Sequence, residues 1–147
     1  MTTTGTEMIG AALDDVKVDE AMSRRVVTAR PDWSLAAAGR KMAEEKIHCI
    51  VVAGVVRRRG REELKWGIVS DEDLVRLCAG GDGTWSAGDA ARTQIVAVEP
   101  ADTVREAARV MAENRTGHLV VVEPATGEPV GVISTLDVAR VLGRGHG

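Results

Sequence analysis

Apolar residues recur along this chain in two kinds of pattern, which predict two kinds of element. In two segments they stand three or four residues apart, the spacing of one buried helix face. These are Leu35, Ala38 and Met42 in the first segment and Val104, Ala107, Ala108 and Met111 in the second. Two other runs, 49–56 and 118–122, are nearly unbroken, rich in β-branched residues and too short for helices. They predict buried strands.

Further strands and helices are expected around these segments. The full set of expected strands is 25–29, 49–56, 65–69, 94–98, 118–122 and 129–133. Helices are expected to begin at the capping residues Asp32 and Asp102, and again after the N-caps Ser70 and Ser134. The last helix of each pattern is expected at 71–78 and 136–142. The order strand, helix, strand, strand, helix therefore occurs twice.

The two patterns are copies of one another. At an offset of 69 residues, nine pairs are identical between 26–52 and 95–121, without a gap. The intervening loop is longer in the first copy, so the offset then falls to 64. At that offset Gly67, Ser70, Asp73 and Arg76 match Gly131, Ser134, Asp137 and Arg140. Such an internal duplication predicts a structural unit that is built twice.

The duplication sets the expected organisation, an α+β fold of two tandem repeats. We expect repeat 1 at 15–79 and repeat 2 at 89–142, joined by a Gly-rich linker at 80–88. Residues 1–14 are expected to form a flexible N-terminus, and 143–147 a tail. A chain of 147 residues is long enough to build its own core.

Composition narrows the functional classes. The net charge is -3 and the only aromatic residues among Phe, Tyr and Trp are three Trp, so the chain lacks the basic charge and the aromatic stacking platform that favour nucleic-acid binding. Cys49 and Cys78 have neither a disulfide framework nor zinc-ligand spacing, which favours a reducing cytoplasm and no metal site. No membrane association is expected, because no apolar run approaches the length of a spanning helix.

The motif Gly-x-x-Ser-x-x-Asp stands in both copies where a strand is expected to meet a helix. Ser70 and Ser134 begin these helices, whose free N–H groups and dipole favour a phosphate. Asp73 and Asp137, one turn further on, offer carboxylate oxygens to the two hydroxyls of a ribose. Together these groups fit a nucleotide. The alternative is that each Ser and Asp form only a capping pair at the helix start.

On these features the chain resembles the CBS domain family, in which two repeats form an intertwined, pseudo-twofold pair called a Bateman module. The resemblance covers residues 16–142 and includes the order of elements, the apolar hairpin and the terminal Gly-x-x-Ser-x-x-Asp. It implies a stand-alone regulatory module with two clefts, each able to take AMP, ADP, ATP or S-adenosylmethionine. No cofactor is required. It also implies a homodimer and a downstream partner protein, which the sequence does not identify.

The resemblance further implies which residues line each cleft. The Asp holds the ribose, the Ser lies near the phosphates, and strand starts of the opposite repeat line the adenine and phosphate. One cleft would join Ser70 and Asp73 with Val96, Ala97, Gly117 and His118. The other would join Ser134 and Asp137 with Val27, Thr28, His48 and Cys49.

Two histidines depart from the family pattern at the phosphate. His48 resembles the His of the His-Arg turn in the regulatory subunit of AMP-activated protein kinase, with Cys49 in place of the Arg. His118 takes that Arg place in the second copy. A His that is neutral at pH 7 offers phosphate less charge than Arg does. Either His is equally well explained as a structural residue at a strand start, so the number of phosphates stays open.

Three other functions compete with ligand sensing. An enzyme is not expected, because the sequence has no Gly-x-x-x-x-Gly-Lys loop, no Ser-His-Asp motif set and no paired carboxylates outside the ribose-type positions. A nucleic-acid binder would use the cluster Arg57, Arg58, Arg59 and Arg61, whose simpler interpretation is a solvated hairpin tip. A degenerate pair would serve only as a dimerisation scaffold.

Overall fold

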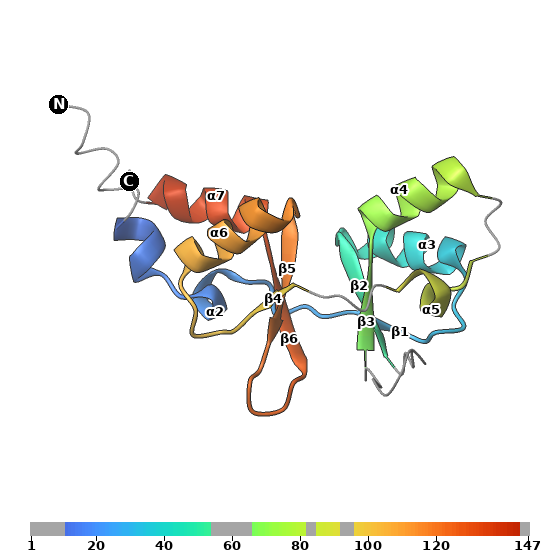
Figure 1. The fold of residues 1–147 in the computed structure, drawn as a ribbon, viewed down its shortest axis with the longest axis horizontal. Helices are drawn as coiled ribbons and strands as arrows, with labels where there is room; N and C mark the ends of the chain where they lie inside the picture. Colours follow the sequence, from blue (N-terminus) through green and yellow to red (C-terminus); the bar gives the residue numbers. More distant parts are fainter. Residues whose placement is uncertain (1–10, 54–65, 82–84, 92–95, 145–147) are drawn as a thin grey trace. The chain divides into compact units, whose positions relative to one another are not determined.

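The chain forms two compact units, each built from one sheet and its helices (Figure 1). The computed structural model describes residues 11–53, 66–81, 85–91 and 96–144. Unit 1 comprises Met1–Val26 and Val96–Gly147, and unit 2 comprises Val27–Ile95.

Unit 2 holds a three-stranded sheet in the order β1-β2-β3. The strands are β1 (Thr28–Ala29), β2 (Cys49–Ala53) and β3 (Trp66–Ser70). β1 runs parallel to β2, because helix α3 (Leu35–Glu45) connects them, and β2 pairs antiparallel with β3. Helix α4 (Asp71–Gly80) follows β3 without a break.

Unit 1 repeats this arrangement with its own sheet, in the order β4-β5-β6. The strands are β4 (Ala97–Val98), β5 (His118–Val122) and β6 (Pro129–Ser134), and the helices are α6 (Val104–Asn114) and α7 (Thr135–Arg144). β4 is parallel to β5, and β5 is antiparallel to β6. The expected α+β fold and its doubled element order are therefore confirmed.

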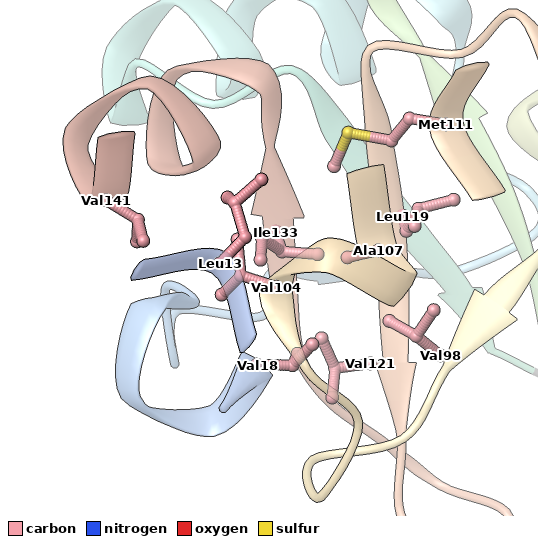
Figure 2. Packing of buried hydrophobic residues seen from close by; sticks show 10 residues of the cluster. All are labelled: Leu13, Val18, Val98, Val104, Ala107, Met111, Leu119, Val121, Ile133 and Val141. Atoms are coloured by element: carbon pink, nitrogen blue, oxygen red, sulfur yellow. The ribbon is translucent and has the colours of Figure 1, made fainter. Parts of the chain in front are cut away.

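Each unit has its own hydrophobic core on one face of its sheet. Figure 2 shows the core of unit 1, where Ala107 and Met111 of α6 lie close to Leu119 of β5 and Ile133 of β6. The core of unit 2 consists of Ala29, Ala38, Met42, Ile50, Val52, Val69, Ala87 and Ala91. The helix stripe expected from the sequence is buried in both units, since Leu35, Ala38, Met42, Val104, Ala107 and Met111 are all buried.

The starts of α3 and α6 differ from the expectation that Asp32 and Asp102 cap them. The N-caps are Ser34 and Thr103, whose hydroxyls accept the N–H groups of the residues three positions on, at 3.0 and 3.1 Å. Asp102 instead accepts the N–H of Glu99 at 2.8 Å, within the turn that leads into the helix. Asp32 pairs with Arg30. Both carboxylates thus stabilise the turn before the helix and not the helix itself.

Each repeat begins with a short helix that the sequence patterns did not predict. In unit 1, α2 (Val18–Ala21) donates its first N–H to the carbonyl of Asp102 at 2.7 Å. In unit 2, α5 (Ala87–Ala90) donates its first N–H to the carbonyl of Trp33, also at 2.7 Å. These contacts are related by the same offset of 69 residues. The leading helix of each sequence repeat therefore packs into the unit that holds most of the other repeat.

Among the described residues, helices extend beyond the bounds expected for the two repeats. Residues 11–15 are helical, and Leu13 is buried in the core of unit 1 together with Val18 (Figure 2). Within the expected linker, α4 extends to Gly80 and α5 begins at Ala87. α7 extends to Arg144, into the expected tail. Leu13 and Ala87 are buried, which holds residues 11–15 and α5 in place, whereas Gly80 and Arg144 at the ends of α4 and α7 are exposed.

The expected first strands are shorter than 25–29 and 94–98, since only two residues of each are paired among the described residues. The cationic loop with Arg57, Arg58, Arg59 and Arg61 lies outside the described residues. Within the described part of the chain, no helix combines the length and the apolarity needed to cross a membrane.

Candidate functional site

In unit 2, the Ser-x-x-Asp motif forms a closed hydrogen-bonded box at the start of α4. The Ser70 hydroxyl accepts the N–H of Asp73 at 3.1 Å, and the Asp73 carboxylate accepts the N–H of Ser70 at 2.9 Å. The other carboxylate oxygen of Asp73 accepts a bond from Arg76, one turn further along the helix. The Asp73 side chain is only 2% exposed, whereas that of Arg76 is 59% exposed. Both oxygens of the Asp73 carboxylate therefore accept hydrogen bonds within the chain.

In unit 1, the second motif forms the same box in a looser version. Asp137 accepts both the N–H and the hydroxyl of Ser134, at 2.8 and 3.1 Å, through a single oxygen. The return bond, from the N–H of Asp137 to the Ser134 hydroxyl, is 3.4 Å long. Arg140 contacts the other oxygen of Asp137 at 3.3 Å, and the Asp137 side chain is 12% exposed. This carboxylate is more accessible than that of Asp73.

The capping pair, which the sequence left open as an alternative, is thus present in both units. A ligand ribose would have to share these carboxylates with the protein. In each unit the Ser N–H is bound to Oδ2, and the Arg guanidinium is bound to Oδ1. The guanidinium is the partner that can leave, because the Arg76 and Arg140 side chains are 59% and 61% exposed, so water can solvate their charge.

The start of β2 lies directly beside the box of unit 2. Cys49 is paired with Ser70 in the β2–β3 register, and the carbonyl of His48 accepts the N–H of Asp71 at 2.8 Å. The His48 ring Nδ1 lies 2.8 Å from the Asp71 carboxylate, and both side chains are exposed to solvent in part. His48 and Cys49 are therefore close to the motif of their own repeat.

Unit 1 has the same backbone contacts with different side chains. His118 is paired with Ser134 in the β5–β6 register, and the carbonyl of Gly117 accepts the N–H of Thr135 at 2.9 Å. The first strands, β1 and β4, are separated from the motif strands β3 and β6 by β2 and β5. The exposed residues among those predicted to line a cleft there are Thr28, Val96 and Ala97, while Val27 is half-buried.

The model of the CBS domain family matches the chain twice, at residues 17–80 and 87–144. The chain belongs to the CBS domain family. The two matches begin at Lys17 and near Ser86, the N-caps of α2 and α5, so each CBS repeat includes the short helix that the sequence patterns did not predict.

Solved structures of CBS proteins share the fold of this pair. The hexameric CBS-CP12 protein from bloom-forming cyanobacteria is 27% identical, with a TM-score of 0.69 over 84% of this chain and 69% of its own. The CBS-domain containing protein ATU1752 from Agrobacterium tumefaciens is 27% identical, with a TM-score of 0.66 over 80% and 84%. The CBS domain pair of protein MJ0100, in complex with 5′-methylthioadenosine and S-adenosyl-L-methionine, is 17% identical, with a TM-score of 0.73 over 88% and 97%. No curated protein matches the chain.

Burial of the Cys49 side chain changes its chemistry. Removal from water, and secondarily the negative charge of Asp71, raise the pKa of the Cys49 thiol to about 12. The thiol therefore stays protonated and unreactive at neutral pH. Cys78 on α4, in contrast, is exposed. No disulfide links the two.

The sequence analysis matched Arg76 with Arg140 but did not identify them as ion-pair partners of the two boxes. Arg76 and Arg140 follow each Asp by three residues, and that helical spacing was the available signal for an ion pair. Asp71, which contacts both His48 and its own helix start, was also not singled out. Within the described ranges, no group of three or more His, Cys, Asp or Glu side chains has the geometry to hold a metal ion.

Proposed function

We propose that this CBS pair is a regulatory module that binds adenosyl ligands and catalyses no reaction. Each CBS repeat supplies one half-site. The first half-site is Ser70 with Asp73, and the second half-site is Ser134 with Asp137. The ligand is an adenine nucleotide (AMP, ADP or ATP) or S-adenosylmethionine.

The observation that carries this proposal is the recurrence of the same box at the same strand-to-helix junction of both CBS repeats. Capping alone does not require the box to follow a buried strand through a Gly-x-x-Ser motif twice. α5 is capped by Ser86 and Asp89 with the same bonds, at 3.1 and 3.2 Å, and the element that precedes it in the described chain is the helix α4, not a strand. The two adenosyl compounds bound in the MJ0100 complex support the ligand class.

The box has the chemistry to take a ribose without losing its cap. We expect Oδ2 of each Asp to keep the Ser N–H, while Oδ1 exchanges its guanidinium for the two ribose hydroxyls. A carboxylate accepts several bonds at once, and hydroxyl donors replace the lost guanidinium donors in kind. The released Arg76 or Arg140 is then available to a negatively charged part of the ligand. In this exchange, no buried polar group loses its hydrogen-bond partner without gaining another.

Regulation would follow from a difference in ligand affinity between two arrangements of the protein. A ligand shifts such an equilibrium by no more than the difference in its two binding free energies. We infer that a partner protein, not identified by the sequence, responds to that shift, and that the chain acts as a homodimer. The two cysteines, which form no disulfide, support a reducing cytoplasm as its compartment.

The decisive experiment is isothermal titration calorimetry with AMP, ADP, ATP, S-adenosylmethionine and 5′-methylthioadenosine. We expect two sites in the parent protein. Asp73→Ala should remove the first half-site and Asp137→Ala the second, and each variant should keep the other. Ligand that binds only the folded state should also raise the melting temperature with its concentration.

Asp89→Ala is the matched control, because it removes the same carboxylate from the capping box of α5 and from neither half-site. It should lower the stability of the protein and leave both ligand affinities unchanged. If no adenosyl compound binds the parent, the proposal is wrong and the chain is a dimerisation scaffold. If the double variant Asp73→Ala/Asp137→Ala binds as the parent does, the assignment of the two half-sites is wrong.

A further inference from the structure

The two half-sites differ in whether the protein itself occupies the helix start. In unit 2, the first three N–H groups of α4 all have acceptors within the chain. The Asp71 N–H is bound to the His48 carbonyl at 2.8 Å, the Glu72 N–H to a carboxylate oxygen of Asp71 at 2.8 Å, and the Asp73 N–H to the Ser70 hydroxyl at 3.1 Å. The Asp71 carboxylate thus lies where a phosphate would accept its bonds.

A second contact fixes this internal anion. The other oxygen of the Asp71 carboxylate lies 2.8 Å from Nδ1 of His48, so both oxygens of Asp71 have partners. The carboxylate is therefore held at the helix start from the side of β2 as well as from the helix. Burial raises the pKa of the Cys49 thiol at the start of β2, and the charge of Asp71 adds to that increase.

At the start of α7 in unit 1, no carboxylate of the described residues other than Asp137 accepts a bond. The Thr135 N–H is bound to the Gly117 carbonyl at 2.9 Å, and the Asp137 N–H has a long bond of 3.4 Å to Ser134. No described residue accepts a hydrogen bond from the N–H of Leu136, which occupies the place of Glu72. This N–H cannot be bonded within the helix, since it lies in the first turn.

The side chains of the two first turns also differ in charge. α4 begins with Asp71, Glu72 and Asp73, whereas α7 begins with Thr135, Leu136 and Asp137 and so carries one acidic residue. Because the half-site Asp is common to both, the first half-site has two additional negative charges. Both lie at the end of the helix where the dipole otherwise favours an anion.

We propose that the two half-sites take different adenosyl ligands: the second half-site takes one with a 5′-phosphate, and the first half-site takes one without. The first would therefore accept a thioether nucleoside or a sulfonium cation and reject AMP, ADP and ATP. This inference rests on the proposed function. It divides that function between the repeats, so the module responds to two classes of metabolite.

The test uses the chain's own counterpart residues to exchange the two helix starts. Asp71→Thr/Glu72→Leu gives α4 the first turn of α7, and Thr135→Asp/Leu136→Glu gives α7 that of α4. One unit charge about 6 Å from a phosphate, at an effective dielectric constant of about 40, changes affinity about tenfold. Two charges therefore predict a change of about a hundredfold.

Each half-site is measured alone by calorimetry, in an Asp137→Ala background for the first and an Asp73→Ala background for the second. At the first half-site, AMP should bind at least about tenfold more weakly than 5′-methylthioadenosine, and Asp71→Thr/Glu72→Leu should abolish this difference. At the second, Thr135→Asp/Leu136→Glu should weaken AMP and leave 5′-methylthioadenosine within about threefold. Glu72→Leu alone keeps the Asp71 contacts and should give an intermediate gain in AMP affinity.

Asp32→Asn is the control for a carboxylate removed elsewhere in unit 2, and it should leave the AMP affinity unchanged. Equal affinities for AMP and 5′-methylthioadenosine at the parent first half-site would overturn this inference and leave the proposed function intact. The same holds if the exchanged helix starts change nothing. If no adenosyl ligand binds at either half-site, both proposals are wrong.

Discussion

The two CBS repeats have the same backbone but differ in the side chains around it. The bond from the first helix N–H to the carbonyl at the strand start is 2.8 Å long in unit 2 and 2.9 Å long in unit 1. Yet the residues that make it are Asp71 with His48 in one unit and Thr135 with Gly117 in the other. Because main-chain atoms make this bond, it constrains neither side chain. A duplicated site can therefore keep its geometry while its charge changes.

The two long helices of each unit also differ between the repeats, here in the size of the side chains that face each other. In unit 2, α3 has a glycine, Gly39, where a Cβ would lie 3.6 Å from the side chain of Leu74 on α4. In unit 1 the counterparts are Ala108 and the smaller Val138. An open apolar hollow of about 300 Å³ lies beside Ala108, Met111 and Val138. The carbon gained at Ala108 and the carbon lost at Val138 leave the summed side-chain volume of the pair nearly unchanged, the kind of change that packed cores tolerate best.

The largest effect is expected where the repeats are most alike, in their cores. Ile50 and Leu119 are counterparts on β2 and β5, and each is 1% exposed. Ile50→Ala and Leu119→Ala should each lower the free energy of unfolding by about 3 kcal/mol, through lost burial and the cavity left behind. Urea denaturation followed by circular dichroism measures this.

Leu136→Ala is the control for the core variants, because the Leu136 side chain is 58% exposed. It should change the free energy of unfolding by less than about 0.5 kcal/mol. A loss at Ile50 that is small beside the loss at Leu119 would mean that the two cores are not equivalent.

The two caps should differ by an intermediate amount. The Ser70 hydroxyl is buried and accepts its N–H at 3.1 Å, whereas the Ser134 hydroxyl is half-buried and accepts at 3.4 Å. Ser70→Ala should therefore cost about 1 to 2 kcal/mol of unfolding free energy, and Ser134→Ala about half as much. Thermal unfolding at saturating and at zero ligand separates this loss from any loss of binding. Equal costs would contradict the contrast between a closed and a loose box.

Much of the fold could be predicted from sequence because its signals are local. The β-branched run at 118–122 became β5 without adjustment, and Ser70 caps the helix that it was expected to cap. Asp32 and Asp102 misled the prediction because a carboxylate before a helix stabilises a turn as readily as a cap. Ser34 and Thr103, two residues and one residue later, carry the same capping chemistry.

The parts that sequence could not predict depend on contacts that are distant along the chain. α2 and α5 have four residues each, too few for an apolar periodicity, and are held by bonds to the carbonyls of Asp102 and Trp33. The two motif serines and aspartates could be found by their spacing. The role of Asp71 could not, because it depends on His48, which is 23 residues away. How each motif pairs with the first strand of the opposite repeat stays a prediction.

The smallest effect on stability at neutral pH is expected at Cys49. Its counterpart in the second repeat is His118. The folded thiol has a pKa of about 12 against an ordinary value of 9.0. Below pH 9 the thiol is protonated in both the folded and the unfolded chain, so its contribution to stability is fully present. As the pH rises from 9 towards 12, only the unfolded chain ionises, and stability is lost. At pH 10 the loss should be about 1.4 kcal/mol relative to pH 8.

Cys49→Ala separates this titration from that of other groups, since it removes the ionisable thiol and keeps the rest of the chain. Its free energy of unfolding should fall less steeply between pH 8 and 10 than that of the parent, by about 1.4 kcal/mol over the interval. A thiol reagent at pH 8 should modify one cysteine per folded chain, the exposed Cys78, and both cysteines after denaturation. Rapid modification of Cys49 in the folded chain would mean that the start of β2 opens readily. The backbone frame that both repeats share would then be less rigid in unit 2 than the matched bond lengths imply.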